Sequence, residues 1–224
     1  MAAVVARRPL DRVLFDPRPR LGDLHDGVER YPSAAIAVRP GFDGVAVPSP
    51  DGRWIAFQRG TSDSAGSHWD LFLVDTLGRN QSQLTSNRWS SQVPSWTTGG
   101  KELVFYANPE GREQLFVLDI ASRDVRPLTR SGGNDTAPSV SPDGRAVAFN
   151  SDRDGLSDLY LLDIRSGAVR RLTTGLQVRS QPGWSRDGRQ LLFSALETGV
   201  DEVYRIGQDG SGLVRLTKGW EGVR

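Results

Sequence analysis

The chain has 224 residues, with 28 Lys plus Arg against 27 Asp plus Glu, and it contains 25 Gly, 13 Pro and no Cys. The absence of Cys excludes disulfide-stapled modules, cysteine-ligated metal sites and thiol catalysis. The near-neutral charge argues against a nucleic-acid-binding protein, because binding a polyanion requires a basic excess. No apolar run approaches the roughly eighteen residues of a membrane span, so we expect no membrane insertion.

Residues 1–45 carry the faintest pattern in the chain. They contain short apolar runs at 12–15 and 36–37, separated by Pro, Gly and Asp residues. We predict that this segment is either irregular or a degenerate copy of the units that follow it.

A repeat begins after residue 45. A Leu-Thr pair recurs at residues 84–85, 128–129, 172–173 and 216–217, so successive pairs are 44 residues apart. A period in the forties indicates a repeated supersecondary unit. We predict units at 46–85, 94–129, 138–173 and 182–217 and one domain overall.

Each unit contains the same succession of turn and apolar run. A turn such as Ser-Pro-Asp-Gly at 141–144 leads into a run that ends in Phe, and a second run such as 159–163 ends in Asp. The runs have four to six residues, are rich in β-branched, aromatic and Leu residues, and are bounded by turn residues, which is typical of strands. Pro presets φ, Asp accepts hydrogen bonds from nearby amides and Gly accepts a positive φ. Four strands are expected in each unit, the outer one ending in Leu-Thr. Four extra residues within 59–68 are expected to form a loop insertion.

Four short antiparallel strands every 40 to 45 residues predict the blade of a β-propeller, an all-β fold. The phrase Ser-Pro-Asp-Gly-Arg-x-x-Ala-Phe, followed by Asp-Leu-Tyr-Leu-Leu-Asp and Arg-Leu-Thr, resembles the WD-like repeats of the TolB propeller family. Such repeats also occur in the propellers of the tricorn protease and of prolyl-oligopeptidase-type peptidases. The resemblance covers about residues 46–217 and implies six blades, whereas the sequence shows four clear units and a possible fifth.

The sequence offers little catalytic chemistry. It has two His residues, both expected in loops, and no Gly-x-Ser-x-Gly nucleophile elbow. The hydrolase domain of prolyl-oligopeptidase-type enzymes is absent from this chain. We therefore expect no enzyme activity and no cofactor.

One segment resembles a calcium loop. Asp152, Asp154 and Asp158 surround a glycine turn, and carboxylates in such a spacing suit a hard cation. An EF-hand also requires a Glu at its twelfth position and flanking helices. Here the twelfth position from Asp152 is Asp163, and the flanking segments are expected to be strands. A polar turn is the favoured interpretation. Asp70 and Glu202 lie at the same phase of the repeat as Asp158, which favours an architectural role for that position.

Residues that break the repeat in the loops are candidates for function. If the strands alternate in direction, the loops between second and third strands share one face with the connectors between units. Trp and Arg are enriched at interface hot spots. The predicted partner-binding residues on this face are Arg88, Trp89, Asp135, Arg153, Arg179 and Trp220. For Trp89, packing at the rim of a blade is the alternative.

The composition and the resemblance favour a non-catalytic scaffold that binds a protein or peptide through its loop face or channel mouth. The alternatives are a propeller domain that accompanies or acts as a peptidase or carbohydrate-active enzyme, and a purely structural repeat. The chain as it stands predicts a cytoplasmic location, since it shows no signal peptide. The resemblance implies a periplasmic or envelope-associated location if the N-terminus is incomplete.

Overall fold

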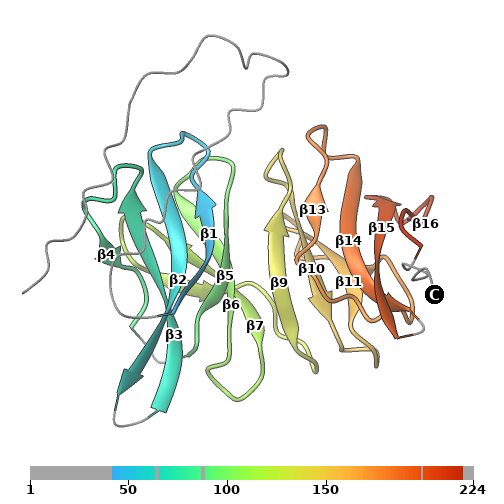
Figure 1. Ribbon diagram of the computed structural model, residues 1–224, viewed down its shortest axis with the longest axis horizontal. Coiled ribbons are helices and arrows are strands. Elements are labelled where there is room, and N and C mark those ends of the chain that lie inside the picture. Colours follow the sequence, from blue (N-terminus) through green and yellow to red (C-terminus); the bar gives the residue numbers. More distant parts are fainter. Residues whose placement is uncertain (1–41, 64–65, 87–88, 198, 219–224) are drawn as a thin grey trace, which may run out of the picture. The chain divides into compact units, whose positions relative to one another are not determined.

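The computed structural model describes residues 42–63, 66–86, 89–197 and 199–218, which all belong to one compact unit spanning residues 36–224. These residues form sixteen strands in four sheets, and each sheet has four antiparallel strands in chain order. The sheets succeed one another along the sequence, as the colours of Figure 1 show. The fold is therefore an all-β propeller built from four-stranded blades.

The four blades have the following strands. The first contains β1 (Asp43–Pro48), β2 (Trp54–Asp63), β3 (Gly66–Asp75) and β4 (Ser82–Gln83). The second contains β5 (Gln92–Trp96), β6 (Glu102–Ala107), β7 (Gln114–Asp119) and β8 (Val125–Pro127). The third contains β9 (Asp135–Val140), β10 (Ala146–Ser151), β11 (Asp158–Asp163) and β12 (Val169–Arg171). The fourth contains β13 (Gly183–Trp184), β14 (Gln190–Glu197), β15 (Val200–Gly207) and β16 (Val214–Arg215).

The turns between the first two strands share the same local bonds in the first, third and fourth blades, which all have Ser and Asp at the same turn positions, whereas the turn of the second blade has no Asp. Between β9 and β10, the Ser141 hydroxyl donates to the Asp143 carboxylate at 2.6 Å, and the same carboxylate accepts from the Arg145 amide at 3.0 Å. Gly144 follows with a φ of +72°, and a Cβ there would lie 2.7 Å from Thr98 Oγ1 of the preceding blade. Glycine is therefore required both for the turn and for the close approach of two blades.

The Leu-Thr pair closes each blade on its third strand. The hydroxyl of Thr173 accepts from the amide of Leu159 at 2.9 Å and donates to the buried Asp158 carboxylate at 2.7 Å. Equivalent amide-to-threonine bonds recur in the other three blades. The repeat in the sequence therefore records a polar link between the outer strand's end and the third strand, and this link is buried in the first three blades.

Apolar side chains fill the space between successive blades. Leu159 and Leu161 of the third blade pack against Leu191 and Phe193 of the fourth, and all four are buried. Hydrogen bonds add to this contact, because the Trp184 indole N–H donates to the Ser139 carbonyl of the preceding blade at 3.0 Å. Trp96 makes the equivalent bond to the carbonyl of Val47, also at 3.0 Å. Trp96 and Trp184 thus have a structural role at the contacts between successive blades.

The strand bounds correct several expectations. The inner strands of the first three blades begin at Asp43, Gln92 and Asp135, ahead of the predicted unit starts at 46, 94 and 138, and the outer strands end just before Leu-Thr. The four extra residues of the first unit lengthen a hairpin instead of forming a loop, since β2 and β3 have ten residues each. A degenerate blade was predicted within residues 1–45. Residues 1–41 lie outside the described part of the chain, so this blade stays a prediction.

Candidate functional site

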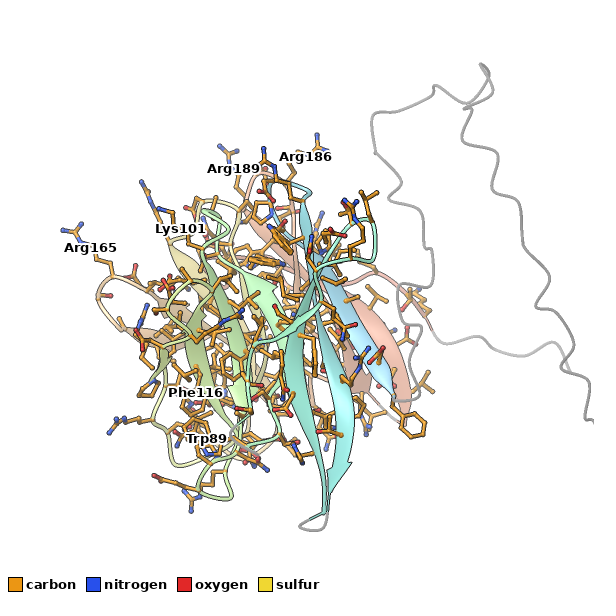
Figure 2. The ribbon with its side chains drawn as sticks, turned by 90° about the vertical axis from the view of Figure 1, so that its left-hand side faces the viewer. Trp89, Lys101, Phe116, Arg165, Arg186 and Arg189 are labelled. Carbon is orange, nitrogen blue, oxygen red and sulfur yellow. The ribbon has the colours of Figure 1, made fainter. Side chains whose placement is uncertain are left out.

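One end of the blades gathers the loops that were predicted to share a face. In the third blade Asp135, at the start of β9, pairs with Ser151, at the end of β10, and Gln92 pairs with Tyr106 in the second. The starts of inner strands, the ends of second strands and the loops that follow them therefore lie together. We call this end the loop face. Figure 2 shows Trp89 toward this end. Lys101 and Arg189, which belong to the turns between first and second strands, lie at the opposite end.

Two of the predicted binding residues, Asp135 and Arg153, bind each other. Asp135 is fully buried and accepts from Arg153 at 2.7 Å, from Ser151 at 2.6 Å and from Ser131 at 3.0 Å. A partner could not touch the Asp135 carboxylate in this state, so the prediction that it contacts a partner is corrected. Its role in the structure is to hold Arg153, whose side chain keeps one fifth of its surface exposed.

The first blade contains the same arrangement. Asp43 accepts two hydrogen bonds from Arg59, at 2.6 and 2.7 Å, and the Arg59 guanidinium lies over the rings of Phe57 and Phe72. The Arg153 guanidinium likewise lies over Phe149 and Tyr160, 5.3 and 5.0 Å from the ring centroids. An arginine that caps an aromatic pair and is held by a buried aspartate is thus a repeated device. Cation–π contacts of this kind add stability when they are partly desolvated.

Trp89 caps the aromatic pair of the second blade. Its ring centroid lies 5.6 Å from that of Phe116, and the two rings stand side by side in Figure 2. Trp89 is half-buried and packs at the edge of the core between the first two blades. This is the packing alternative raised from the sequence. Arg88 and Trp220, two further candidates, lie outside the described residues.

The carboxylates of the calcium-like segment have separate partners. Asp152 accepts from the amide and side chain of Asn134 at 2.6 and 2.9 Å, and Asp154 accepts from the Tyr160 hydroxyl at 2.6 Å. Asp158 accepts from Arg171, Thr173 and two amides within its own blade. Across the described ranges, no three His, Cys, Asp or Glu side chains come together as a metal-binding group. The favoured interpretation as a polar turn agrees with these contacts.

A cavity of about 460 Å³ opens at the loop face where the first strands of the blades begin. We call it the loop-face cavity. Its lining comes from inner strands, from the ends of second strands and from connectors. The lining residues include Val45, Val93, Tyr106, Glu113, Thr136, Ala137, Asn150, Ser157, Arg179 and Gln181.

Backbone geometry shapes this cavity. Val45, Val93 and Ala137 occupy the same phase of successive blades and have φ values of +39°, +49° and +51°. The pairing register shifts at each of these positions, as expected for a β-bulge. Positive φ is unfavourable for β-branched residues, and such strain is often found at binding sites. The bulges bring backbone and small side chains to the cavity in three consecutive blades.

The cavity has a negative side. Burial raises the pKa of Glu113, and the nearby Asp152 carboxylate raises it further. Burial also raises the pKa of Tyr106 to about 12, with a further contribution from the charge of Glu113. Arg179 lies in the same cavity, with its Nε 3.7 Å from an Asp201 carboxylate oxygen. The predicted candidate Arg179 therefore belongs to this cavity, whereas Trp89 and Arg153 cap aromatic pairs.

The sequence contains a signal for the polar residues of this cavity. The residue after the Phe of each second strand is polar in all four units, and these residues are Gln58, Tyr106, Asn150 and Ser194. Two of them line the cavity. Gln58 accepts a hydrogen bond from the Val93 amide of the next blade at 2.9 Å. A polar residue that recurs directly after a buried Phe marks the side of the sheet that faces the cavity.

The fold and this cavity define a β-propeller with a recessed, polar site on its loop face. The TolB beta propeller domain family matches residues 45–222, and the chain belongs to this family. No curated protein matches the sequence at a significant level. The described part of the chain contains no helix of the length and apolar character needed to span a membrane.

Solved structures share the fold. TolB from Acinetobacter baumannii is 26% identical with a TM-score of 0.69, and the match covers 79% of this chain and 44% of that one. A putative TolB from Agrobacterium tumefaciens is 19% identical with a TM-score of 0.66, covering 80% and 82%. A puromycin hydrolase mutant complexed with PGG is 17% identical with a TM-score of 0.61, covering 78% and 28%. The chain thus spans less than half the length of the first TolB, and the fold occurs in TolB proteins and in a hydrolase alike.

Proposed function

We propose that this chain is a TolB-like propeller that binds an extended peptide segment of a partner protein in the loop-face cavity. The cavity itself carries this proposal. Ligand sites are typically concave, with a few polar groups that fix orientation, and fall at about this volume. The location at the starts of the inner strands also leaves main-chain groups near the bulges of β1, β5 and β9 within reach of a peptide backbone.

Family membership supports the choice of partner and favours the envelope-associated location over the cytoplasmic one. Under this proposal Arg179 contacts the bound segment directly, while Asp135 and Arg153 keep the neighbouring loop in place. The alternative is that the chain belongs to an enzyme, because the puromycin hydrolase has the same fold. The two functions differ in one measurable outcome, since an enzyme would release the bound peptide chemically changed.

The test is selection of peptides from a displayed random library against the purified chain. We expect binders whose affinity falls at least tenfold in Thr136→Trp, because a large side chain on β9 would fill the cavity. Leu77→Trp is the matched control, since Leu77 is exposed in the hairpin after β3 at the opposite end of its blade. Binding that survives Thr136→Trp, or is lost equally in Leu77→Trp, would contradict the proposal. Mass spectrometry of the recovered peptide separates binding from conversion.

A further inference from the structure

The hydrogen-bond donors in the loop-face cavity are largely engaged within the protein. The Tyr106 hydroxyl donates to Gln92 at 3.2 Å, and the Ser157 hydroxyl donates to the Val178 carbonyl at 3.1 Å. The Gln181 side-chain amide donates to the Pro138 carbonyl at 2.6 Å. A ligand that offers only acceptors would therefore find few neutral side-chain donors among the described lining residues.

An acceptor in the cavity has no partner. Asn150 is 3% exposed, and its Nδ2 donates to the Ser180 carbonyl at 3.0 Å. That bond fixes the orientation of the side-chain amide, because the carbonyl of Ser180 cannot donate. Asn150 Oδ1 is left buried without a donor among the described residues. Leaving a buried acceptor unsatisfied costs about 1–3 kcal/mol, so a ligand donor here would gain more than at an exposed carbonyl.

The second free acceptor is the carboxylate of Glu113. It is half-buried, and no described residue donates a hydrogen bond to it or forms an ion pair with it. Asp152, another acid, contributes to the raised pKa of Glu113, and the charge of Glu113 in turn raises the pKa of Tyr106. Basic groups nearby are held elsewhere, since Arg153 binds Asp135. A cation that replaced the lost water around Glu113 would relieve both its desolvation and the repulsion from Asp152.

Arg179 completes the recognition pattern. Arg179 is one of the residues that line the cavity, and its ion pair with Asp201, at 3.7 Å, is longer than a hydrogen bond. Its N–H groups can therefore donate to a main-chain carbonyl of a bound peptide. The lining thus presents acceptors at Glu113 and Asn150 and charged donors at Arg179.

From this arrangement we infer that the loop-face cavity recognises a primary ammonium group, which donates its N–H bonds to the Glu113 carboxylate and to Asn150 Oδ1. This inference rests on the proposed function, because the ammonium group belongs to the bound peptide. Two sources share this chemistry, the N-terminal amine of a peptide and the side chain of a lysine. A peptide N-terminus also presents a carbonyl close to its amine, which Arg179 can bind.

Three small probes separate these sources. Tri-alanine amide carries only an N-terminal ammonium, N-acetyl-lysine methylamide carries only a side-chain ammonium, and N-acetyl-tri-alanine amide carries no cation. Each is titrated to about 10 mM while the side-chain amide signal of Asn150 is followed by NMR, since single-group contacts give millimolar affinity. We expect a saturable shift with at least one of the two amines and none with the acetylated tri-alanine amide.

Variants test the contact itself. Glu113→Gln keeps the shape of the side chain and removes its charge, so we expect the affinity for the amine to fall about tenfold, the size of one charge-assisted hydrogen bond. Glu110→Gln is the matched control, because Glu110 is an exposed acid of the adjacent loop and its loss changes the net charge equally. Equal affinity in Glu113→Gln and wild type, or no shift with either amine, overturns the inference.

The outcomes keep the two proposals apart. If the acetylated and free tri-alanine amides bind equally well and both are lost in Thr136→Trp, peptide binding in the cavity stands and ammonium recognition falls. If the displayed peptides bind but ignore Thr136→Trp, the proposed function falls whatever the amine probes do.

Discussion

Arg153 donates a 2.7 Å hydrogen bond to Asp135, a carboxylate with no exposed surface, at the loop-face end of the third blade. Removing one partner of a buried pair leaves the other charge without compensation, which typically costs 3–5 kcal/mol. Because Ser131 and Ser151 still donate to Asp135, we expect Arg153→Met to lower the free energy of unfolding by about 3 kcal/mol, near the lower end of that range.

Urea denaturation followed by tryptophan fluorescence measures this change. Arg145→Met is the control, since its guanidinium lies 4.0 Å from Asp143 and both side chains are largely exposed. That substitution should change stability by less than about 0.5 kcal/mol. Similar losses in the two variants would show that Arg153 contributes no more than a surface charge.

Threonines at the same phase of two blades should differ in importance. Thr173 accepts a hydrogen bond from the Leu159 amide and also donates one to the Asp158 carboxylate. Thr129 accepts the equivalent bond from the Leu115 amide, but its blade has Gln114 at the position of Asp158. Thr173→Val should therefore cost more than Thr129→Val, by about 1 kcal/mol or more, because it also takes a donor from a buried carboxylate. Equal costs in urea denaturation would mean that the Asp158 bond adds nothing to the backbone bond.

The contrast between these positions shows what the sequence can predict. Turns and strands follow from local chemistry that recurs along the chain, so the Gly-containing turns and the four Phe-ending runs identify the fold. The pairing of Asp135 with Arg153 was not predicted, because the arginine of the equivalent pair in the first blade, Arg59, stands at a different position of the repeat. Arg59 lies two residues after Phe57, whereas Arg153 lies four residues after Phe149, and both guanidinium groups still reach the same place.

The loop-face cavity was harder to predict than the fold. Glu113 and Asn150 become neighbours of one cavity only because the inner strands bulge where the register shifts. Bulges at Val93 and Ala137 have no signature in the sequence, since residues with positive φ are usually Gly or Asn. The sequence therefore indicated this face and Arg179, which lines the cavity, but not the acceptors beside it.

Acid should destabilise the protein partly through Asp158. Burial alone would raise the pKa of this carboxyl, but the hydrogen bonds from Thr173, Arg171 and the amides of Gly175 and Leu176 outweigh burial and lower the pKa below 3.8. A lowered pKa means that the folded state favours the carboxylate, so its stabilising contribution is present above the unfolded pKa and is lost as the pH falls through the folded one.

We therefore expect the stability of the wild type to fall as the pH decreases from about 5 to about 2, and to fall less steeply in Asp158→Asn. The exposed turn residue Asp143 also has a lowered pKa, caused mainly by the hydrogen bond from Ser141, and it remains in both proteins as an internal reference. Thermal melts across this pH range give the comparison. Parallel curves for the two proteins would contradict a role for Asp158 in acid unfolding.

One face of the fourth blade is apolar and exposed to solvent, whereas the equivalent face of the third blade is buried. Leu172 is 9% exposed and packs against the fourth blade, whereas Leu216, at the same phase one unit later, is 50% exposed. Leu192 and Val203 on the same face are exposed as well, and their counterparts Ala148 and Leu159 are fully buried. Leu172→Ala should cost about 3 kcal/mol through lost burial and a residual cavity, and Leu216→Ala less than about 1 kcal/mol.

The comparison of these two leucines also reports on what covers the fourth blade in solution. Both substitutions remove the same atoms from the same position of the repeat, and both residues donate their amide to the third strand at 2.8 and 2.7 Å. A difference in unfolding free energy therefore measures side-chain burial alone. If Leu216→Ala costs as much as Leu172→Ala, or if its cost grows with protein concentration, then this face is buried against further chain or a second copy, because only packing could supply the missing energy.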